Sequence, residues 1–199
     1  MDQEPGGLMP KPTIKPGQVY SRVSLENRET ATLRGPKWDD LDDLTEYING
    51  LVEEHANITK TEKVTRESEA EWLGQRLAEI ENGRMIHLVA EVRGKVVGAG
   101  EVSQLPEERS HTGYLGIGIS KGHRGQGLGT ALMQALKELS KKAGMKILIL
   151  DAFATNKVAI NLYEKIGFKE VGRIPKGIYR NGKYIDLVRM TTELLSNKS

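Results

Sequence analysis

The chain of 199 residues contains no cysteine, few aromatic residues and no long hydrophobic run. The absence of cysteine excludes disulfide bonds, zinc sites with thiolate ligands and a thiol nucleophile. No segment approaches the roughly 18 apolar residues of a membrane span, and no apolar signal-peptide core is found, so we expect a cytoplasmic protein without a membrane partner. The net charge of +2 gives no electrostatic reason to expect nucleic acid as a partner.

The composition that remains, 38% hydrophobic and 28% charged, is typical of a soluble globular protein. Residues 1–17 hold four prolines and three glycines and show no hydrophobic periodicity. We therefore predict a flexible arm over 1–17, followed by one domain over 18–195.

The hydrophobic periodicity predicts a mixed α/β domain without internal repeats. Strands are expected at 18–25, 30–34, 85–92, 95–105, 112–120, 146–152, 168–174 and 184–190. Helices are expected within 36–55 and 67–83, and at 130–143 and 156–166. The run KILILDA at 146–152 is continuously apolar, which predicts a strand buried on both faces. The dipeptide Asn181-Gly182 predicts a type I′ turn between the last two strands.

The stretch SKGHRGQGLGTALMQAL, 120–136, places four glycines directly before a helix. A helix N-terminus offers unpaired N–H groups and a positive dipole end, and glycines let a ligand approach the backbone. His123 and Arg124 add positive character. The stretch predicts a cradle for phosphate or pyrophosphate. The alternative is a tight strand-to-helix connection, which would need fewer glycines.

Other glycine motifs fit this chain less well. No Gly-Lys-Ser/Thr is present, so there is no P-loop. The dinucleotide motif G-x-G-x-x-G fails at Thr130, but Asp151 lies where a ribose-binding acid would, which leaves an NAD-dependent oxidoreductase as an alternative. Residues 118–122 match G-x-S-x-G, but no histidine follows His123 to complete a hydrolase triad. The four histidines have no metal-ligand spacing, so no metal is expected.

Two spaced motifs resemble the GCN5-related N-acetyltransferases. Arg124-Gly125-Gln126-Gly127-Leu128-Gly129 is similar to the signature R/Q-x-x-G-x-G/A, and NKVAINLYEKIGF at 156–168 is similar to the second motif of the family. The likeness covers about residues 29–192. It implies the fold of that family, a mixed and mostly antiparallel splayed sheet with helices on both faces. It also implies acetyl coenzyme A (acetyl-CoA) as cosubstrate.

The resemblance assigns roles to individual residues. The backbone of Ile117, Gly118 and Ile119 would pair with the pantetheine arm. The pyrophosphate would be held at Arg124, Gly125, Gln126, Gly127, Leu128, Gly129 and Thr130. Asn156 would bind the pantetheine, cap the following helix, or do both. Tyr163 is the preferred candidate to protonate the leaving thiolate, and core packing on this helix face is the alternative role.

The general base is less determined by the sequence. Some family members use a glutamate on strand four, and Gly113 stands at the matching position here. Asp151 matches an acid five residues before the motif asparagine in protein N-terminal acetyltransferases, while Glu101 and His111 are further candidates. A structural role is an alternative for each of these three residues.

The reaction implied is direct acetyl transfer to a primary amine, since no cysteine is present to carry the acetyl group. A small-molecule acceptor such as an amino acid is the preferred expectation, and a protein N-terminus or lysine is the alternative. A non-catalytic coenzyme A sensor and the NAD-dependent oxidoreductase are competing functions. A homodimer would follow the habit of the family.

Overall fold

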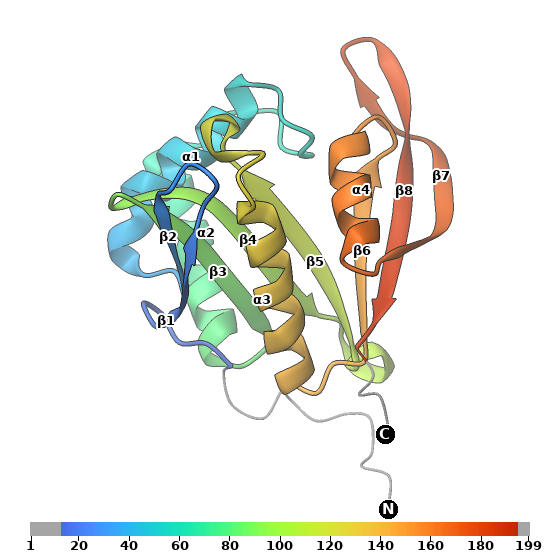
Figure 1. Cartoon of the computed structure of the whole chain (residues 1–199). Helices are drawn as coiled ribbons and strands as arrows, with labels where there is room; N and C mark the ends of the chain where they lie inside the picture. The colour runs from blue at the N-terminus through green and yellow to red at the C-terminus, as the bar shows by residue number, and fades with distance from the viewer. Residues whose placement is uncertain (1–12, 195–199) are drawn as a thin grey trace, which may run out of the picture.

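The structure, a computed structural model, describes residues 13–194 and arranges them as an eight-stranded sheet with helices on both faces (Figure 1). The strands are β1 (Val19–Ser24), β2 (Thr30–Arg34), β3 (Met85–Val92), β4 (Lys95–Gln104), β5 (Thr112–Ile119), β6 (Ile147–Phe153), β7 (Lys169–Arg180) and β8 (Lys183–Glu193). The helices are α1 (Leu41–Glu53), α2 (Arg66–Glu81), α3 (Leu128–Lys142) and α4 (Lys157–Lys165), with 3₁₀ turns at Trp38–Asp40, Glu107–Arg109 and Lys121–His123. The predicted order of helices and strands is confirmed.

The sheet has the strand order β1-β2-β3-β4-β5-β6-β8-β7. Every neighbouring pair is antiparallel except β5 and β6, which run parallel. In the β7–β8 turn, Asn181 and Gly182 both have positive φ, of 50° and 74°. A type I′ turn needs positive φ at both central residues, so this predicted turn is confirmed.

Each face of the sheet carries its own hydrophobic layer. On one face, α1 and α2 bury Leu41, Leu44, Leu73, Leu77 and Ile80 against Met85, Val89 and Val96. On the other face, α3 packs Leu128, Leu132 and Leu136 against the strands, and Ile160 and Tyr163 of α4 belong to the same layer. Groups on opposite faces can therefore meet only where the sheet itself opens.

The prediction that 146–152 is buried on both faces is wrong. In β6, Leu148 and Leu150 are buried, whereas Ile147, Ile149 and Asp151 are half-buried. The alternation shows that one face of β6 lies against the core while the other is only partly covered, and the end of the strand, Leu150–Phe153, lines a cavity. An apolar sequence alone cannot distinguish a cavity wall from a packed layer, because both are shielded from bulk water.

A buried ion pair fixes the start of α1. Both terminal nitrogens of Arg34, at the end of β2, donate to the two carboxylate oxygens of Asp40 at 2.7 Å. Arg34 also donates through Nε to Glu91 of β3 at 2.9 Å. This bidentate geometry compensates the desolvation of both groups, and it ties the beginning of α1 to the sheet.

The predicted arm over 1–17 lies mostly in residues 1–12, outside the described residues. Of the described part, Ile14 is only 1% exposed and belongs to the core layer that contains α3. The backbone of Gly17 also donates to the carbonyl of Gly35. The described end of this segment is therefore packed against the domain.

Ile14→Ala is expected to destabilise the protein by about 2–5 kcal/mol, because it removes a buried side chain and leaves a cavity. Urea unfolding followed by circular dichroism measures this change. Lys15→Ala, which truncates the exposed neighbouring side chain, should change the unfolding free energy little. Equal effects of the two substitutions would show that Ile14 contributes nothing to the core.

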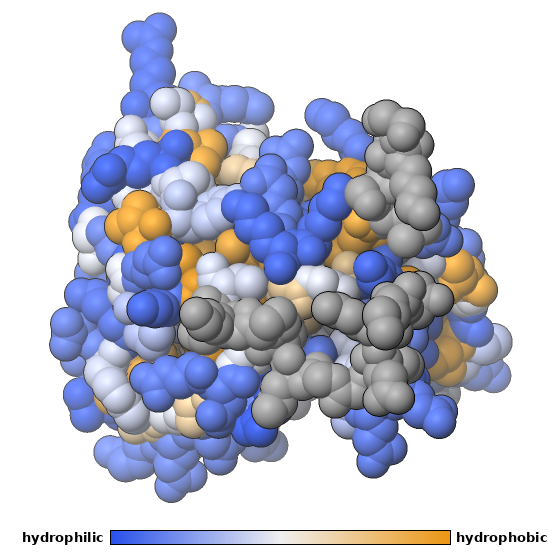
Figure 2. All heavy atoms as spheres, turned by 90° about the horizontal axis from the view of Figure 1, so that it is seen from below, coloured by the Kyte–Doolittle hydropathy of each residue, from blue (hydrophilic) through white to orange (hydrophobic). Residues whose placement is uncertain are grey.

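The surface seen from below in Figure 2 is mainly hydrophilic, with small and separate hydrophobic patches. In the described part of the chain, no helix is both long and apolar enough to span a membrane.

Candidate active site

The sheet opens between β5 and β6. Their parallel pairing covers only three residue pairs and ends at Tyr114 and Ile149. Beyond this point β5 remains paired with β4 alone. The strands therefore diverge on one side of Tyr114, which confirms the splayed sheet and creates a passage between its two faces.

The register of β4 and β5 determines which backbone groups face this gap. The N–H of Ser120 donates to the carbonyl of Val97, and hydrogen-bonded pairs alternate along antiparallel strands. The backbone of Gly118 therefore faces β4, whereas the backbone groups of Ile117 and Ile119 face the gap. Among the three predicted pantetheine positions, these two have the orientation needed for pairing with an extended arm.

The glycine loop leads from this gap into α3. Six consecutive backbone N–H groups, from Gly125 to Thr130, donate to no acceptor in residues 13–194. Gly125 and Gly127 have φ of +69° and +85°, and a Cβ atom at either position would meet no atom within 4 Å. Free amides at a helix N-terminus, open to approach, are the geometry of an anion site. The loop fits the predicted pyrophosphate.

The side chain of Arg124 is exposed, but two partners within the protein hold it in place. Its Nε donates to the carbonyl of Ile119 at 2.7 Å, and its Nη2 forms an ion pair with Glu54, the residue that follows α1. Arg124 therefore shapes the loop and links it to α1.

A cavity of about 440 Å³ passes through the gap between β5 and β6. It brings together the predicted residues Glu101, Ile117, Gly118, Asp151, Asn156 and Tyr163. It is also lined by α1, α2 and the connection between them, through Tyr47, Asn57, Ile58, Lys60, Glu69, Trp72 and Arg76. Residues from both faces of the sheet thus meet in one space.

Tyr163 and Asn156 enter the cavity from α4. Burial raises the pKa of Tyr163 to about 12, so its hydroxyl keeps its proton at neutral pH. That hydroxyl makes no hydrogen bond with the described residues. The Oδ1 atom of Asn156 accepts from the N–H of Ala159 at 3.3 Å, which confirms its role as helix cap. Since Asn156 also lines the cavity, the capping role and the predicted ligand role are compatible.

Glu101 lies on the α2 side of the cavity beside two nitrogen-bearing side chains. Its carboxylate is 3.4 Å from Nε of Arg76 and 4.0 Å from Nδ1 of His87, both longer than good hydrogen bonds. Burial raises the pKa of Glu101, although Arg76 opposes this shift. Burial and Arg76 together lower the pKa of His87 to about 4. Glu101 is thus a loosely paired carboxylate with enhanced basicity next to a neutral histidine.

Asp151 has a different environment. Arg189 of β8 donates to both of its oxygens, at 2.8 and 2.7 Å, and the hydroxyl of Tyr114 donates to one of them at 3.0 Å. The Arg189 hydrogen bonds lower the pKa of Asp151. A carboxylate with a lowered pKa and occupied oxygens is a weak proton acceptor. This network instead connects β5, β6 and β8 at the point where β5 and β6 separate.

His111, the remaining candidate for the general base, does not line the cavity. His111 is in the turn before β5, where its carbonyl accepts from Lys146. A side chain at Gly113 would meet Val102, Met145 and Leu148 in the core. Sequence reasoning missed Arg76, Glu69, Tyr114 and Arg189. The only available signal for the first two was the presence of polar residues beside Leu73 and Leu77 of α2.

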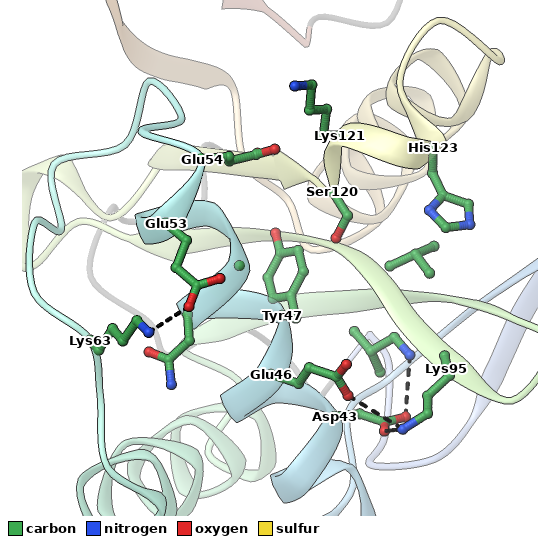
Figure 3. A pocket seen from close by; sticks show the side chains of 14 residues that line it. Asp43, Glu46, Tyr47, Glu53, Glu54, Lys63, Lys95, Ser120, Lys121 and His123 are labelled. Carbon is green, nitrogen blue, oxygen red and sulfur yellow. Dashed lines mark hydrogen bonds and ion pairs between the residues drawn. The ribbon is translucent and has the colours of Figure 1, made fainter.

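A second cavity of about 560 Å³ lies outside α1 and next to the loop that follows β5 (Figure 3). Tyr47 lines both cavities and forms part of the wall between them. Carboxylates there form ion pairs. Lys95 contacts Asp43 and Glu46, and Lys63 contacts Glu53. This cavity holds none of the predicted catalytic residues. Within residues 13–194, no group of three or more acidic or histidine side chains could hold a metal ion.

Comparison with known proteins identifies the family. The model of the acetyltransferase (GNAT) family matches residues 50–168, more than half of the chain. An L-methionine sulfoximine/L-methionine sulfone acetyltransferase from Pseudomonas aeruginosa is 24% identical over 175 residues, covering 85% of this chain and 98% of that protein.

Solved structures of acetyltransferases have a similar fold. A ribosomal-protein-alanine N-acetyltransferase from Brucella melitensis is 28% identical with a TM-score of 0.73, covering 81% of this chain and 98% of that one. A phosphinothricin acetyltransferase from Sinorhizobium meliloti, in complex with acetyl-CoA, is 22% identical with a TM-score of 0.73, covering 82% of this chain and 88% of that one. The chain belongs to the acetyltransferase (GNAT) family and is an acetyl-CoA-dependent N-acetyltransferase.

Proposed function

We propose that this acetyltransferase acts on the primary amine of a small molecule, an amino acid or a related amine. The observation that carries the proposal is the cavity through the sheet, which places Glu101 on one face and Tyr163 on the other. The relative that acetylates L-methionine derivatives supports an acceptor of this size.

The cosubstrate would bind on the α3 and α4 side. The amides from Gly125 to Thr130 would hold the pyrophosphate, and the backbone of Ile117 and Ile119 would pair with the pantetheine arm. Asn156 would hydrogen-bond the same arm through its free Nδ2 group. This arrangement directs the thioester into the gap, toward Tyr163.

The acceptor would enter from the α1 and α2 side, with its amine next to Glu101. An amine must lose a proton before it can attack the thioester, and Glu101 is placed to accept that proton. The positive charge of Arg76 disfavours an ammonium there, as it does on His87. The C–N bond then forms, the C–S bond breaks, and Tyr163 gives its proton to the thiolate of coenzyme A.

Acetylation of a protein N-terminus is the second candidate. The relation to a ribosomal-protein-alanine acetyltransferase supports it.

One observation argues against an NAD-dependent oxidoreductase. The carboxylate of Asp151 is occupied by Arg189 and Tyr114 and is not free to bind a ribose.

Saturating acetyl-CoA is expected to raise the unfolding free energy by about 2.7 kcal/mol at a hundred times its Kd, whereas NAD should have no effect. Thermal unfolding with acetyl-CoA, coenzyme A and NAD measures this. Stabilisation by NAD alone would overturn the proposal.

Thiol release with a panel of small amines and N-terminal peptides then identifies the acceptor class. Faster release with small amines supports the proposal, and faster release with peptides supports the second candidate. Coenzyme A binding without acetyl transfer to any acceptor would indicate a non-catalytic coenzyme A sensor.

A further inference from the structure

Glu69 is a buried residue whose carboxyl group opens into the cavity and has no partner among residues 13–194. It lies in the first turn of α2, is only 6% exposed and lines the cavity on the acceptor side. Its side chain forms no hydrogen bond and no ion pair with residues 13–194. Lys60 lines the same cavity but does not reach ion-pair distance.

This situation is unfavourable and differs from that of the buried pair Arg34–Asp40. A carboxyl group that is partly removed from water and makes no hydrogen bond carries a free-energy cost, which is larger when the group is ionised. Arg34 and Asp40 avoid that cost through their bidentate pair. Because Glu69 faces the cavity, a ligand in that cavity can provide the missing donor.

The position of Glu69 indicates which part of a ligand it would meet. Arg76, beside Glu101, is seven residues further along α2, which corresponds to about 10 Å along the helix axis. Trp72 lies between them on the cavity wall, and Leu44 and Ile58 add apolar surface. An acceptor with its reacting amine at Glu101 therefore has its opposite end at Glu69.

We propose that Glu69 binds a positively charged group at the end of the acceptor that is remote from the acetylated amine. The inference rests on the proposed function and narrows the acceptor to amines with a second cationic group, such as diamines. A cation fits better than a neutral donor, because it adds the Coulomb attraction between opposite charges to the hydrogen bond. The apolar wall at Trp72 suits the methylene chain between the two charges.

The test compares α,ω-diaminoalkanes of four to eight carbons with 1-aminoalkanes of the same length. In the unaltered protein, kcat/KM should favour the diamine by at least about tenfold at the best length, because a monoamine leaves the carboxylate unpaired. Glu69→Gln should reduce this preference to about twofold or less while kcat/KM for the monoamine changes little. Glu71→Gln, at an exposed position of the same helix, should keep the full preference.

A second substitution at the same position tests the inference separately from Glu69→Gln. Glu69→Asp shortens the side chain by one methylene and should move the preferred diamine to a longer chain. An unchanged diamine-to-monoamine ratio in both variants would overturn the inference.

Ligand binding without turnover separates this inference from the proposed function. In thermal unfolding with coenzyme A present, diamines should raise Tm more than monoamines, and Glu69→Gln should remove the difference. That result supports Glu69 as a cation site even if no acetyl transfer is detected. Transfer to small amines with no diamine preference in either assay would uphold the proposed function and refute the inference.

Discussion

Tyr163→Phe is expected to lower kcat by about a hundredfold or more and to leave the Kd for acetyl-CoA nearly unchanged. The substitution removes one hydroxyl from α4 and keeps the ring that packs near Phe168. Since burial raises the pKa of Tyr163 to about 12, the hydroxyl is protonated at all pH values of interest. General acid catalysis by a positioned group typically contributes about 10²–10⁴-fold.

Steady-state thiol release gives kcat, and titration calorimetry gives the Kd of acetyl-CoA. Tyr179→Phe provides the matched control, because Tyr179 is 66% exposed on β7. A variant with kcat within about threefold of the parent would mean that the thiolate takes its proton from another source. A parallel loss of acetyl-CoA affinity would assign Tyr163 to binding rather than to proton transfer.

Glu101→Gln is expected to reduce kcat/KM by about a hundredfold near neutral pH and to remove the acidic limb of the pH profile. Glu101 accepts a proton only when ionised, so activity falls as pH decreases through its pKa. Burial raises that pKa above the ordinary value of 4.5, which places the limb at higher pH than for an exposed glutamate. The neutral amide cannot titrate, so the remaining activity of the variant should lack this limb.

Asp151→Asn is the informative comparison for Glu101. Hydrogen bonds from Arg189 lower the pKa of Asp151, and its titration therefore lies below the range in which the limb is expected. The variant should keep the acidic limb even where its rate falls through altered strand spacing. Loss of the limb in Asp151→Asn and its retention in Glu101→Gln would reverse the assignment of the base.

Much of the fold could be predicted because its signals are local. The glycines of 122–129, the turn at Asn181-Gly182 and the cap at Asn156 act within a few residues of the chain, and their effects are present in the structure. The two motifs at 124–129 and 156–168 also place the glycine loop before a helix and Tyr163 on a helix, as the structure has them.

The acceptor side of the site depends on contacts that the sequence does not contain. Asp151 and Arg189 are 38 residues apart, and only the pairing of β6 with β8 brings them together. Without knowledge of that pairing, Asp151 is expected to be a free carboxylate. It is therefore a reasonable candidate for the general base. Glu69 and Arg76 are ordinary polar residues of an amphipathic helix until the sheet opening gives their face of α2 a cavity. For the same reason β6 could not be recognised as a cavity wall.

The short contact between β5 and β6 has a mechanical consequence. Among the described residues, three residue pairs and the hydrogen bonds from Lys146 and Ile147 to His111 are the backbone connection between the strand group β1–β5 and the group β6–β8, so we expect the angle between these groups to change more easily than the other strand angles. An extended pantetheine arm hydrogen-bonded to the backbone of Ile117 and Ile119 would restrict the angle between the two strand groups. We therefore expect the amides of Ile117 and Ile119, which face the gap, to exchange with deuterium freely in the unliganded enzyme and slowly once acetyl-CoA occupies the gap.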